Sequence, residues 1–201
     1  MRRLLFAVVL LALVAGVVGA GVWIVGTRSA GAGSWYDRAV YPLQYDDAIR
    51  ASSRHNHLDP ALVAAVIYAE SRFDAGARSE HGAVGLMQVL PETAEQIAGE
   101  TGGVDFVPED LTDPEVNVRY GTYYLRAVLD QFDGDLVAAV AAYNAGAGAV
   151  QEWVDEAHAA GRGRLRISDI PYEETRAYVR SVLEARAAYR HAYGDRLPRP
   201  S

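Results

Sequence analysis

The stretch "AVIYAESRFD", residues 64–73, is typical of a helix that carries an acid on its apolar side. The apolar residues around it stand at the spacing of a single stripe along a helix: Leu62, Val63, Val66 and Ile67. Glu70 follows Val66 by four residues and Ile67 by three, so it continues this stripe. Burial raises the pKa of a carboxyl group, and a group that stays protonated near neutral pH can serve as a general acid.

A structural role is the alternative for Glu70, with the carboxylate paired to an arginine such as Arg72 or Arg119. The next stretch favours the catalytic interpretation. "SEHGAVGLMQVLPETA", residues 79–94, holds glycines that permit close backbone approach and positive φ. Its Gln88 offers a donor and an acceptor, which sugar hydroxyl and acetamido groups require.

Helical periodicity dominates the chain from Pro42 onward, and no alternating run is long enough to build a sheet core. Asp59-Pro60 and Asp113-Pro114 each read as an N-cap followed by a first-turn proline. Residues 74–90 are predicted to form a loop and residues 194–201 a loose tail. The sequence therefore predicts a mostly α body, with helices over 42–56, 60–73, 91–99, 114–132, 136–144, 149–160 and 171–193.

The N-terminus predicts a membrane anchor. Leu4–Gly26 is a run of 23 residues without a charge, and a bilayer core needs about 20 apolar residues as a helix. Arg2 and Arg3 precede it, so the body should lie on the extracytoplasmic side of the cell membrane. We therefore predict a signal anchor over residues 1–26 and a linker over 27–40. The alternative is secretion after cleavage at Ala30-Gly31-Ala32, which has the small-x-small form of a cleavage site.

Composition excludes several classes of protein. The chain has 201 residues and no cysteine, which excludes a disulfide framework and thiolate metal sites. The formal net charge is −7. An acidic body lacks the clustered basic residues that nucleic-acid binding requires, so no nucleic-acid partner is expected.

Two further motifs carry polar residues at helix ends. "AAYNAGAGAV", residues 141–150, places Tyr143 and Asn144 before a glycine, which offers a stacking surface and an amide; simple helix termination is the alternative. "IPYEETRAYV", residues 170–179, places Glu174 and Tyr178 on one helix face. The alternative for Glu174 is a first-turn acid that complements the helix dipole.

Two patterns favour ordinary structural interpretations. "HNH" at residues 55–57 has the composition of a metal site, but residues two apart on a helix do not face each other, so a solvated helix end is favoured. Tyr120, Tyr123 and Tyr124 could form a glycan platform. At helical spacing they are more typical of core positions.

Four stretches together resemble a known family: "ES" at 70–71, "GLMQVLP" at 85–91, "AYNAG" at 142–146 and "IPYEETRAYV" at 170–179. Their order is similar to that of the motifs of bacterial soluble-type lytic transglycosylases, which are lysozyme-like enzymes that cut peptidoglycan. The resemblance implies a lysozyme-like catalytic domain over residues 41–193. It implies that Glu70 is the single catalytic acid at the floor of a cleft and that five residues contact substrate: Ser79, Gln88, Tyr143, Asn144 and Glu174.

The resemblance also implies the chemistry: cleavage of the β-1,4 bond between N-acetylmuramic acid and N-acetylglucosamine, with 1,6-anhydro-muramic ends and no metal or nucleotide cofactor. The partner is then the peptidoglycan glycan strand, with an envelope complex as a further possible partner. A hydrolytic lysozyme is one alternative, and it needs a second carboxylate, for which Asp74 is the nearest candidate. A non-catalytic glycan-binding or scaffold subunit is the other.

Overall fold

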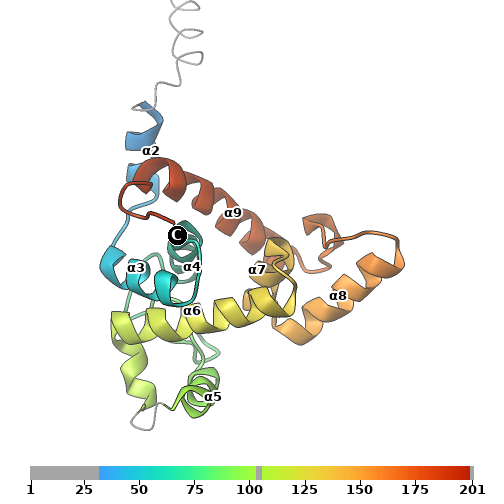
Figure 1. Cartoon of the computed structure of the whole chain (residues 1–201), viewed down its shortest axis with the longest axis horizontal. Helices are drawn as coiled ribbons and strands as arrows, with labels where there is room; N and C mark the ends of the chain where they lie inside the picture. Colours follow the sequence, from blue (N-terminus) through green and yellow to red (C-terminus); the bar gives the residue numbers. More distant parts are fainter. Residues whose placement is uncertain (1–31, 103–105, 200–201) are drawn as a thin grey trace, which may run out of the picture.

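The computed structural model describes residues 32–102 and 106–199. These residues form a mostly α fold, as the sequence predicts, and the elements lie in the arrangement shown in Figure 1. The helices are α2 (Ala32–Val40), α3 (Asp46–His55), α4 (Pro60–Ser71), α5 (Pro91–Thr101), α6 (Pro114–Gln131), α7 (Leu136–Ala145), α8 (Ala147–Ala159) and α9 (Glu173–Tyr193), with short 3-10 turns η1 (Pro108–Thr112) and η2 (Ile167–Asp169).

Helix α4 is the central helix, and its buried residues run without interruption from Pro60 to Tyr68. The Asp59 side chain caps it by accepting a hydrogen bond from Ala61 N at 3.2 Å, as predicted. The helix ends at Ser71, two residues earlier than expected, because Arg72 and Phe73 have φ of 54° and 67°. This reversal turns the Phe73 ring into the core, 6.3 Å from the ring centre of Tyr189.

Helix α9 crosses the domain and packs against α4, α7 and α2 in turn (Figure 1). It is anchored to the start of α4 because Arg186 and Arg190 both donate to Asp59 Oδ2, at 2.7 and 2.6 Å. Its N-terminal half therefore lies near the C-terminal end of α4. That end of α4 carries Glu70.

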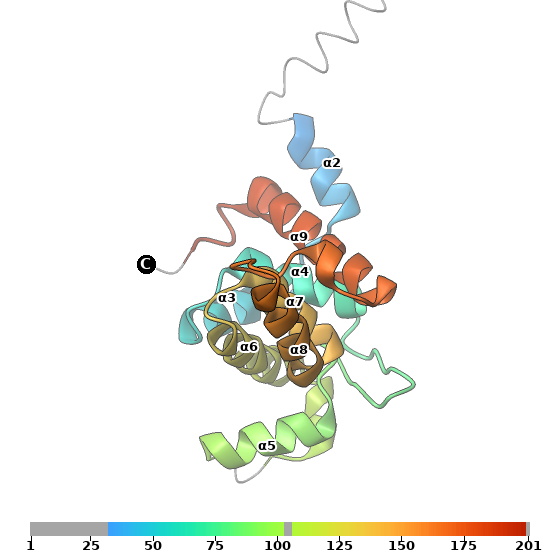
Figure 2. The same cartoon turned by 90° about the vertical axis from the view of Figure 1, so that its right-hand side faces the viewer.

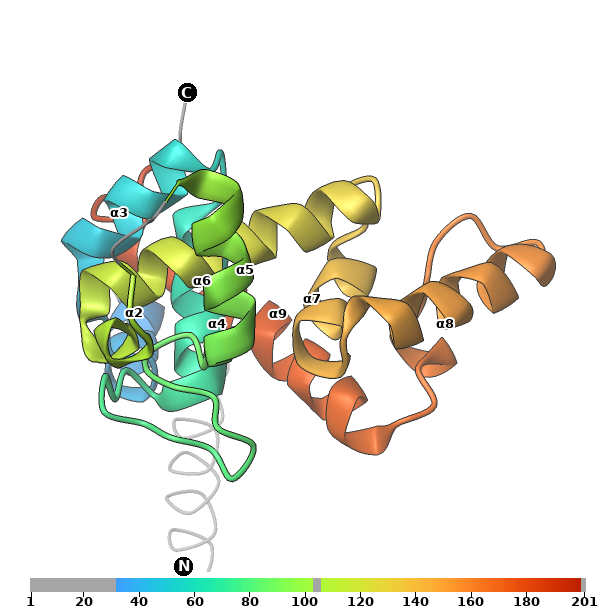
Figure 3. The same cartoon turned by 90° about the horizontal axis from the view of Figure 1, so that it is seen from below.

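Helix α6 runs through the domain and contacts α3, α5 and α7 (Figure 3). It starts where predicted, with Asp113 Oδ1 accepting from the backbone N–H groups of Glu115 and Val116. Its buried residues include Leu125 and Val128. Between α4 and α5, residues 72–90 form the predicted loop, which isolated antiparallel bridges join at Arg78–Val84 and Val84–Val89.

The prediction of a linker over 27–40 is wrong for residues 32–40, which form α2. Small residues suggested a flexible chain, but contacts with α9 stabilise the helix. Arg38 donates to Ala192 O at 2.9 Å, and Asp37 Oδ2 accepts from His191 Nδ1 at 2.7 Å. The next residues join the same cluster, since the ring of Tyr41 lies 4.9 Å from that of Tyr68. Helices α2 and α5 lie at opposite ends of the molecule in Figure 2.

Three other predicted boundaries shift. The helix expected from Pro42 begins only at Asp46, because Tyr45 adopts φ of 53°. The helix expected at Ala149 begins at Ala147, directly after the positive φ of Gly146. The last helix begins at Glu173 rather than Pro171, because Tyr172 has an extended backbone with φ of −90° and ψ of 124°.

The predicted membrane-spanning segment, Leu4–Gly26, lies outside the described residues. Within 32–102 and 106–199, none of the helices combines the length and the apolar character needed to cross a bilayer.

Candidate active site

Glu70 lies in the last turn of α4 with its carboxyl group mostly buried. Its polar contact comes from α9, where the Tyr178 hydroxyl donates to Glu70 Oε1 at 2.6 Å. Burial raises the pKa of Glu70 from 4.5 to about 7, while the hydrogen bond from Tyr178 acts in the opposite direction. Glu70 can therefore hold a proton near neutral pH and can also release it.

Two partly buried tyrosines lie beside this carboxyl group. Burial and the charge of Glu70 raise the pKa values of Tyr143 and Tyr178 well above their usual range, so both hydroxyl groups stay protonated. The Tyr143 hydroxyl donates to Met87 O at 2.9 Å, which ties the end of α7 to the glycine-rich loop. Its ring packs on Tyr124 of α6, with ring centres 5.3 Å apart.

The loop that follows α4 is fixed to Glu70 through the neighbouring residue. Ser71 donates to Leu86 O at 2.8 Å, so the end of α4 and the segment "GLMQ" are held together. Gln88 has φ of 47°, and its side-chain amide donates to Ala77 O and Gly85 O at 3.2 and 3.0 Å. The amide nitrogen of Gln88 thus shapes the loop.

Asn117 of α6 is fully buried and supports the same loop through hydrogen bonds to its backbone. Its Nδ2 donates to Val84 O and Leu111 O, both at 2.8 Å, and its Oδ1 accepts from Met87 N at 2.8 Å. Gly85 is required at this contact, because a Cβ there would lie 2.3 Å from Asn117 Nδ2.

The structure brings together only part of the predicted site. Glu70, Tyr143 and the loop with Gln88 lie together through the contacts above. Ser79 lies farther along the loop, where its hydroxyl accepts from Ala83 N at 3.0 Å. Asn144 and Glu174 are exposed at the end of α7 and the start of α9. Among the described residues, no hydrogen bond joins Ser79, Asn144 or Glu174 to Glu70.

The arginine-paired alternative for Glu70 is wrong. Arg72 lies over the ring of Tyr68, 4.1 Å from its centre, and Arg119 lies beside the ring of Tyr120. Burial and Tyr178 are the two influences on the pKa of Glu70, so neither arginine holds its charge.

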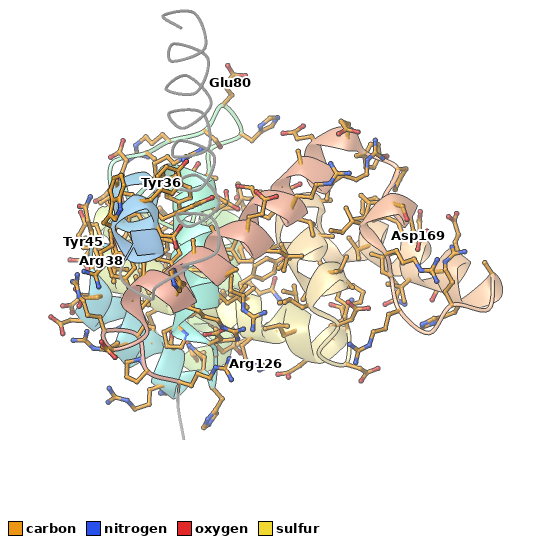
Figure 4. All side chains as sticks on the ribbon, turned by 90° about the horizontal axis from the view of Figure 1, so that it is seen from above. Tyr36, Arg38, Tyr45, Glu80, Arg126 and Asp169 are labelled. Atoms are coloured by element: carbon orange, nitrogen blue, oxygen red, sulfur yellow. The ribbon has the colours of Figure 1, made fainter. Side chains whose placement is uncertain are left out.

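The second-carboxylate candidate is oriented elsewhere. Asp74 is exposed, and its Oδ1 accepts from Gly76 N at 2.8 Å within the turn after α4. The outer part of this loop extends away from the helices, as Glu80 shows in Figure 4. Within the described part of the chain, including residues 55–57, no cluster of His, Asp or Glu is suited to hold a metal ion.

Sequence reasoning missed three residues that organise the site: Ser71, Asn117 and Tyr178. Tyr178 stood in the quoted motif, but only its spacing to Glu174 was considered. Asn117 shares a helix face with Gly121, Leu125 and Val128, so a polar group on an apolar stripe was the available signal.

The chain is similar to known proteins over most of its length. Residues 47–164 match the model of the transglycosylase SLT domain. The chain is 35% identical over 179 residues to the soluble lytic murein transglycosylase of Salmonella typhimurium, covering 87% of this chain and 27% of the relative. It is 30% identical over 172 residues to the membrane-bound lytic murein transglycosylase C of Actinobacillus pleuropneumoniae, covering 76% of this chain and 47% of the relative.

A solved structure shows the same fold. The lytic transglycosylase Slt of Pseudomonas aeruginosa, determined as an inactive glutamate-to-glutamine mutant, superposes with a TM-score of 0.70 at 33% identity. The match covers 82% of this chain and 26% of that one. This chain thus spans about a quarter of the length of the soluble relatives it matches. The matches include soluble and membrane-bound lytic transglycosylases, and the chain belongs to the transglycosylase SLT domain family.

Proposed function

We propose that this protein is a peptidoglycan lytic transglycosylase that uses Glu70 first as a general acid and then as a general base. The observation that carries the proposal is a mostly buried carboxyl group whose pKa is raised to about 7 and whose hydrogen-bond partner is a phenol. A general acid is most effective when its pKa lies near the working pH.

In the first step, protonated Glu70 donates its proton to the glycosidic oxygen between N-acetylmuramic acid and N-acetylglucosamine. The C1–O bond breaks, and N-acetylglucosamine leaves with the proton. Glu70 is then ionised, and the Tyr178 hydroxyl stabilises the carboxylate through the 2.6 Å hydrogen bond. The acetamido group of the substrate supports the positive charge that develops at C1.

In the second step, the muramic 6-hydroxyl attacks C1 while ionised Glu70 removes its proton. An O6–C1 bond forms, which closes the 1,6-anhydro ring, and Glu70 returns to its protonated state. The attacking hydroxyl belongs to the same sugar, so proximity favours it over free water.

The surroundings of Glu70 favour this route over hydrolysis. A retaining hydrolase needs a nucleophilic carboxylate about 5–5.5 Å from the acid, and an inverting one needs a base at about 6.5–9.5 Å. No carboxylate of a described residue contributes to the raised pKa of Glu70, and Asp74 is engaged in its own turn. The Pseudomonas aeruginosa relative, inactive as a glutamate-to-glutamine mutant, supports a single essential glutamate. The remaining groove contacts proposed for substrate are Ser79, Gln88, Tyr143, Asn144 and Glu174.

The product tests the proposal. Purified sacculi are digested with the full chain in detergent, with Glu70→Gln as the control, and the released muropeptides are analysed by mass spectrometry. We expect ends that are lighter by one water and resist borohydride reduction. A majority of reducible muramic ends would establish hydrolysis instead, and Asp74 would then be the first residue to replace.

The proposed location is the cell membrane, with the domain on the extracytoplasmic side, through the 23 uncharged residues Leu4–Gly26. The membrane-bound relative supports this arrangement. Cell fractionation should place the full chain with membranes and with an intact N-terminus. A mature N-terminus at Gly33 would show a cleaved signal and a secreted protein.

A further inference from the structure

A pocket separate from the Glu70 site lies on the side of α6 that faces away from the loop of residues 72–90. It has a volume of about 350 Å³ and lies between the C-terminal ends of α3 and α5 and the first half of α6. Helix α6 contacts both α3 and α5, and Figure 3 shows all three in the same part of the molecule. The lining includes His55, Asn56, Ile97, Arg119, Tyr120 and Tyr123, and it shares no residue with the Glu70 site.

The face of α6 explains why this pocket is separate. Gly121 packs against Met87 of the loop, since a Cβ there would lie 2.5 Å from Met87 Sδ. Arg119 and Tyr123 are two residues before and after Gly121, which places them on the other side of the helix. The two patterns left aside in the sequence, the "HNH" stretch and the tyrosine group, therefore meet in one pocket.

The polar lining suits a carboxylate with an amide beside it. His55 and Arg119 are exposed, and the ion pairs among the described residues involve neither of them. A guanidinium group can bind a carboxylate through two parallel hydrogen bonds. Arg119 thus offers a guanidinium group without an ion-pair partner among the described residues, on a chain whose net charge is −7.

Asn56 supplies the complementary acceptor, and 9% of the residue is exposed. Its Nδ2 donates to Thr122 Oγ1 at 2.9 Å and to Ser52 O at 3.2 Å, which fixes the orientation of the amide. Its Oδ1, with no donor among the described residues, is the atom left for a ligand N–H. The rings of Tyr120 and Tyr123 and the side chain of Ile97 form apolar walls that suit a small methyl-bearing group. The Tyr123 hydroxyl is engaged elsewhere, since it donates to Glu100 Oε2 at 3.2 Å.

We propose that this pocket binds the free carboxyl end of a peptidoglycan stem peptide, and this proposal rests on the proposed function. Arg119, with His55, holds the terminal carboxylate, Asn56 accepts from the last peptide N–H, and the D-alanine methyl group packs against the apolar walls. The pocket size, near the lower end of the range for small-ligand sites of about 300–1,000 Å³, fits the last one or two residues of a peptide. The enzyme would thus hold a neighbouring peptide while Glu70 cuts a glycan strand.

The test uses the full chain carrying Glu70→Gln in detergent, so that no substrate is consumed. Saturation-transfer NMR measures the Kd of a synthetic stem tetrapeptide with a free carboxyl terminus and of the same peptide as its C-terminal amide. We expect the amide to bind about fivefold to tenfold more weakly, because it lacks the charge that Arg119 holds. Arg119→Gln should weaken binding of the free peptide by a similar factor and abolish the difference between the two peptides.

The matched control is Arg54→Gln, which removes the same charge from an exposed position one residue before His55 and outside the pocket lining. It should leave both Kd values within about twofold, because the exposed charge of Arg54 lies outside the pocket and solvent ions screen its effect on the bound carboxylate. Equal binding of acid and amide, or an equal loss in Arg54→Gln and Arg119→Gln, would overturn the proposal. Preferential binding of a peptide-free glycan fragment in an Arg119-dependent manner would also overturn it. Muropeptide release by the unsubstituted chain is measured separately, so a failure of the pocket is distinguishable from a failure of the proposed function.

Discussion

Helix α4 carries a carboxyl group at each end, and the two have opposite surroundings. Asp59, at the start, caps the helix and accepts from two guanidinium groups, those of Arg186 and Arg190. Glu70, at the other end, is mostly buried and has a phenol as its partner. Both contacts come from α9, one helix that supplies cations to the first carboxylate and a neutral donor to the second.

The difference separates an acid that links two helices from the acid that we propose to be catalytic. Asp59 accepts hydrogen bonds from Arg186 and Arg190, so it links α4 to α9. Burial at Glu70 disfavours the charge and raises the pKa to about 7. The same fold that stabilises one end of α4 thereby holds a proton at the other, and the following changes test this contrast.

The largest expected effect is on activity in Glu70→Gln. The amide preserves shape but can neither donate nor accept the proton, and general acid–base catalysis contributes about 10²–10⁴-fold for each role. Muropeptide release should fall by at least about 10³-fold, since Glu70 serves both roles. Asp59→Asn is the control and should retain most of the turnover while folded. Glu70→Gln with more than about a tenth of the wild-type rate would exclude Glu70 as the catalytic acid.

The second effect concerns the support of the loop beside Glu70. Asn117→Ala leaves Met87 N, Val84 O and Leu111 O without their buried partner, so the free energy of unfolding should fall by about 3 kcal/mol. A displaced loop should also lower kcat by about 10²-fold at a temperature where the variant is folded. Thr122→Val, on the other side of α6, is the matched buried control. Equal kcat values for the two variants would limit Asn117 to a role in stability.

The third effect is the change in the free energy of unfolding when each acid of α4 is replaced by its amide. At pH 8 this change has opposite signs for Glu70 and Asp59. The folded-state pKa of Glu70, about 7, exceeds the ordinary value of 4.5, so the folded state loses stability as pH rises through that interval. Glu70→Gln should therefore raise the free energy of unfolding at pH 8 by up to about 3 kcal/mol and have little effect at pH 4.

Asp59→Asn should instead lower stability by about 1–2 kcal/mol at pH 8, because asparagine still caps the helix but loses the attraction of both arginines. Urea unfolding of both variants at pH 4 and pH 8 measures the two changes. A loss of stability in Glu70→Gln at pH 8 would contradict the contrast between the two acids.

The smallest effect is expected for Tyr178→Phe. The hydrogen bond from Tyr178 lowers the pKa of Glu70, so its loss should raise that pKa further. The alkaline limb of the pH–rate profile should move to higher pH, with kcat lower by about tenfold. Tyr124→Phe keeps its ring against Tyr143 and serves as the control. A limb that stays in place in Tyr178→Phe would show that this hydroxyl does not act on Glu70.

The sequence predicted most of the helices and the position of Glu70, because capping residues and apolar periodicity are local signals. Asp59, Pro60 and Asp113 set helix starts where expected. It did not predict α2, whose formation depends on contacts with α9 more than 150 residues away in the chain, at Arg38–Ala192. It also placed the end of α4 too late, because the positive φ of Arg72 and Phe73 follows from the packing of Phe73 in the core.

Within the candidate site, motif order indicated Glu70, the proposed acid, but not its hydrogen-bond partner. Tyr178 is 108 residues from Glu70, and only the crossing of α9 over α4 brings them together. The importance of Asn117 could have been predicted from the sequence, because this residue interrupts an apolar stripe as Glu70 does. The pattern that drew attention to one polar residue on a buried face applied equally to the other.

The most direct test of the central claim is the titration of Glu70 itself. The side-chain carboxyl carbon is followed by NMR in the full chain between pH 3 and 9, approximately, and is assigned by its absence in Glu70→Gln. The account predicts a midpoint at about 7, because burial outweighs the hydrogen bond from Tyr178. A midpoint near the ordinary value of 4.5 would mean that Glu70 is ionised at neutral pH, which would contradict its role as the general acid.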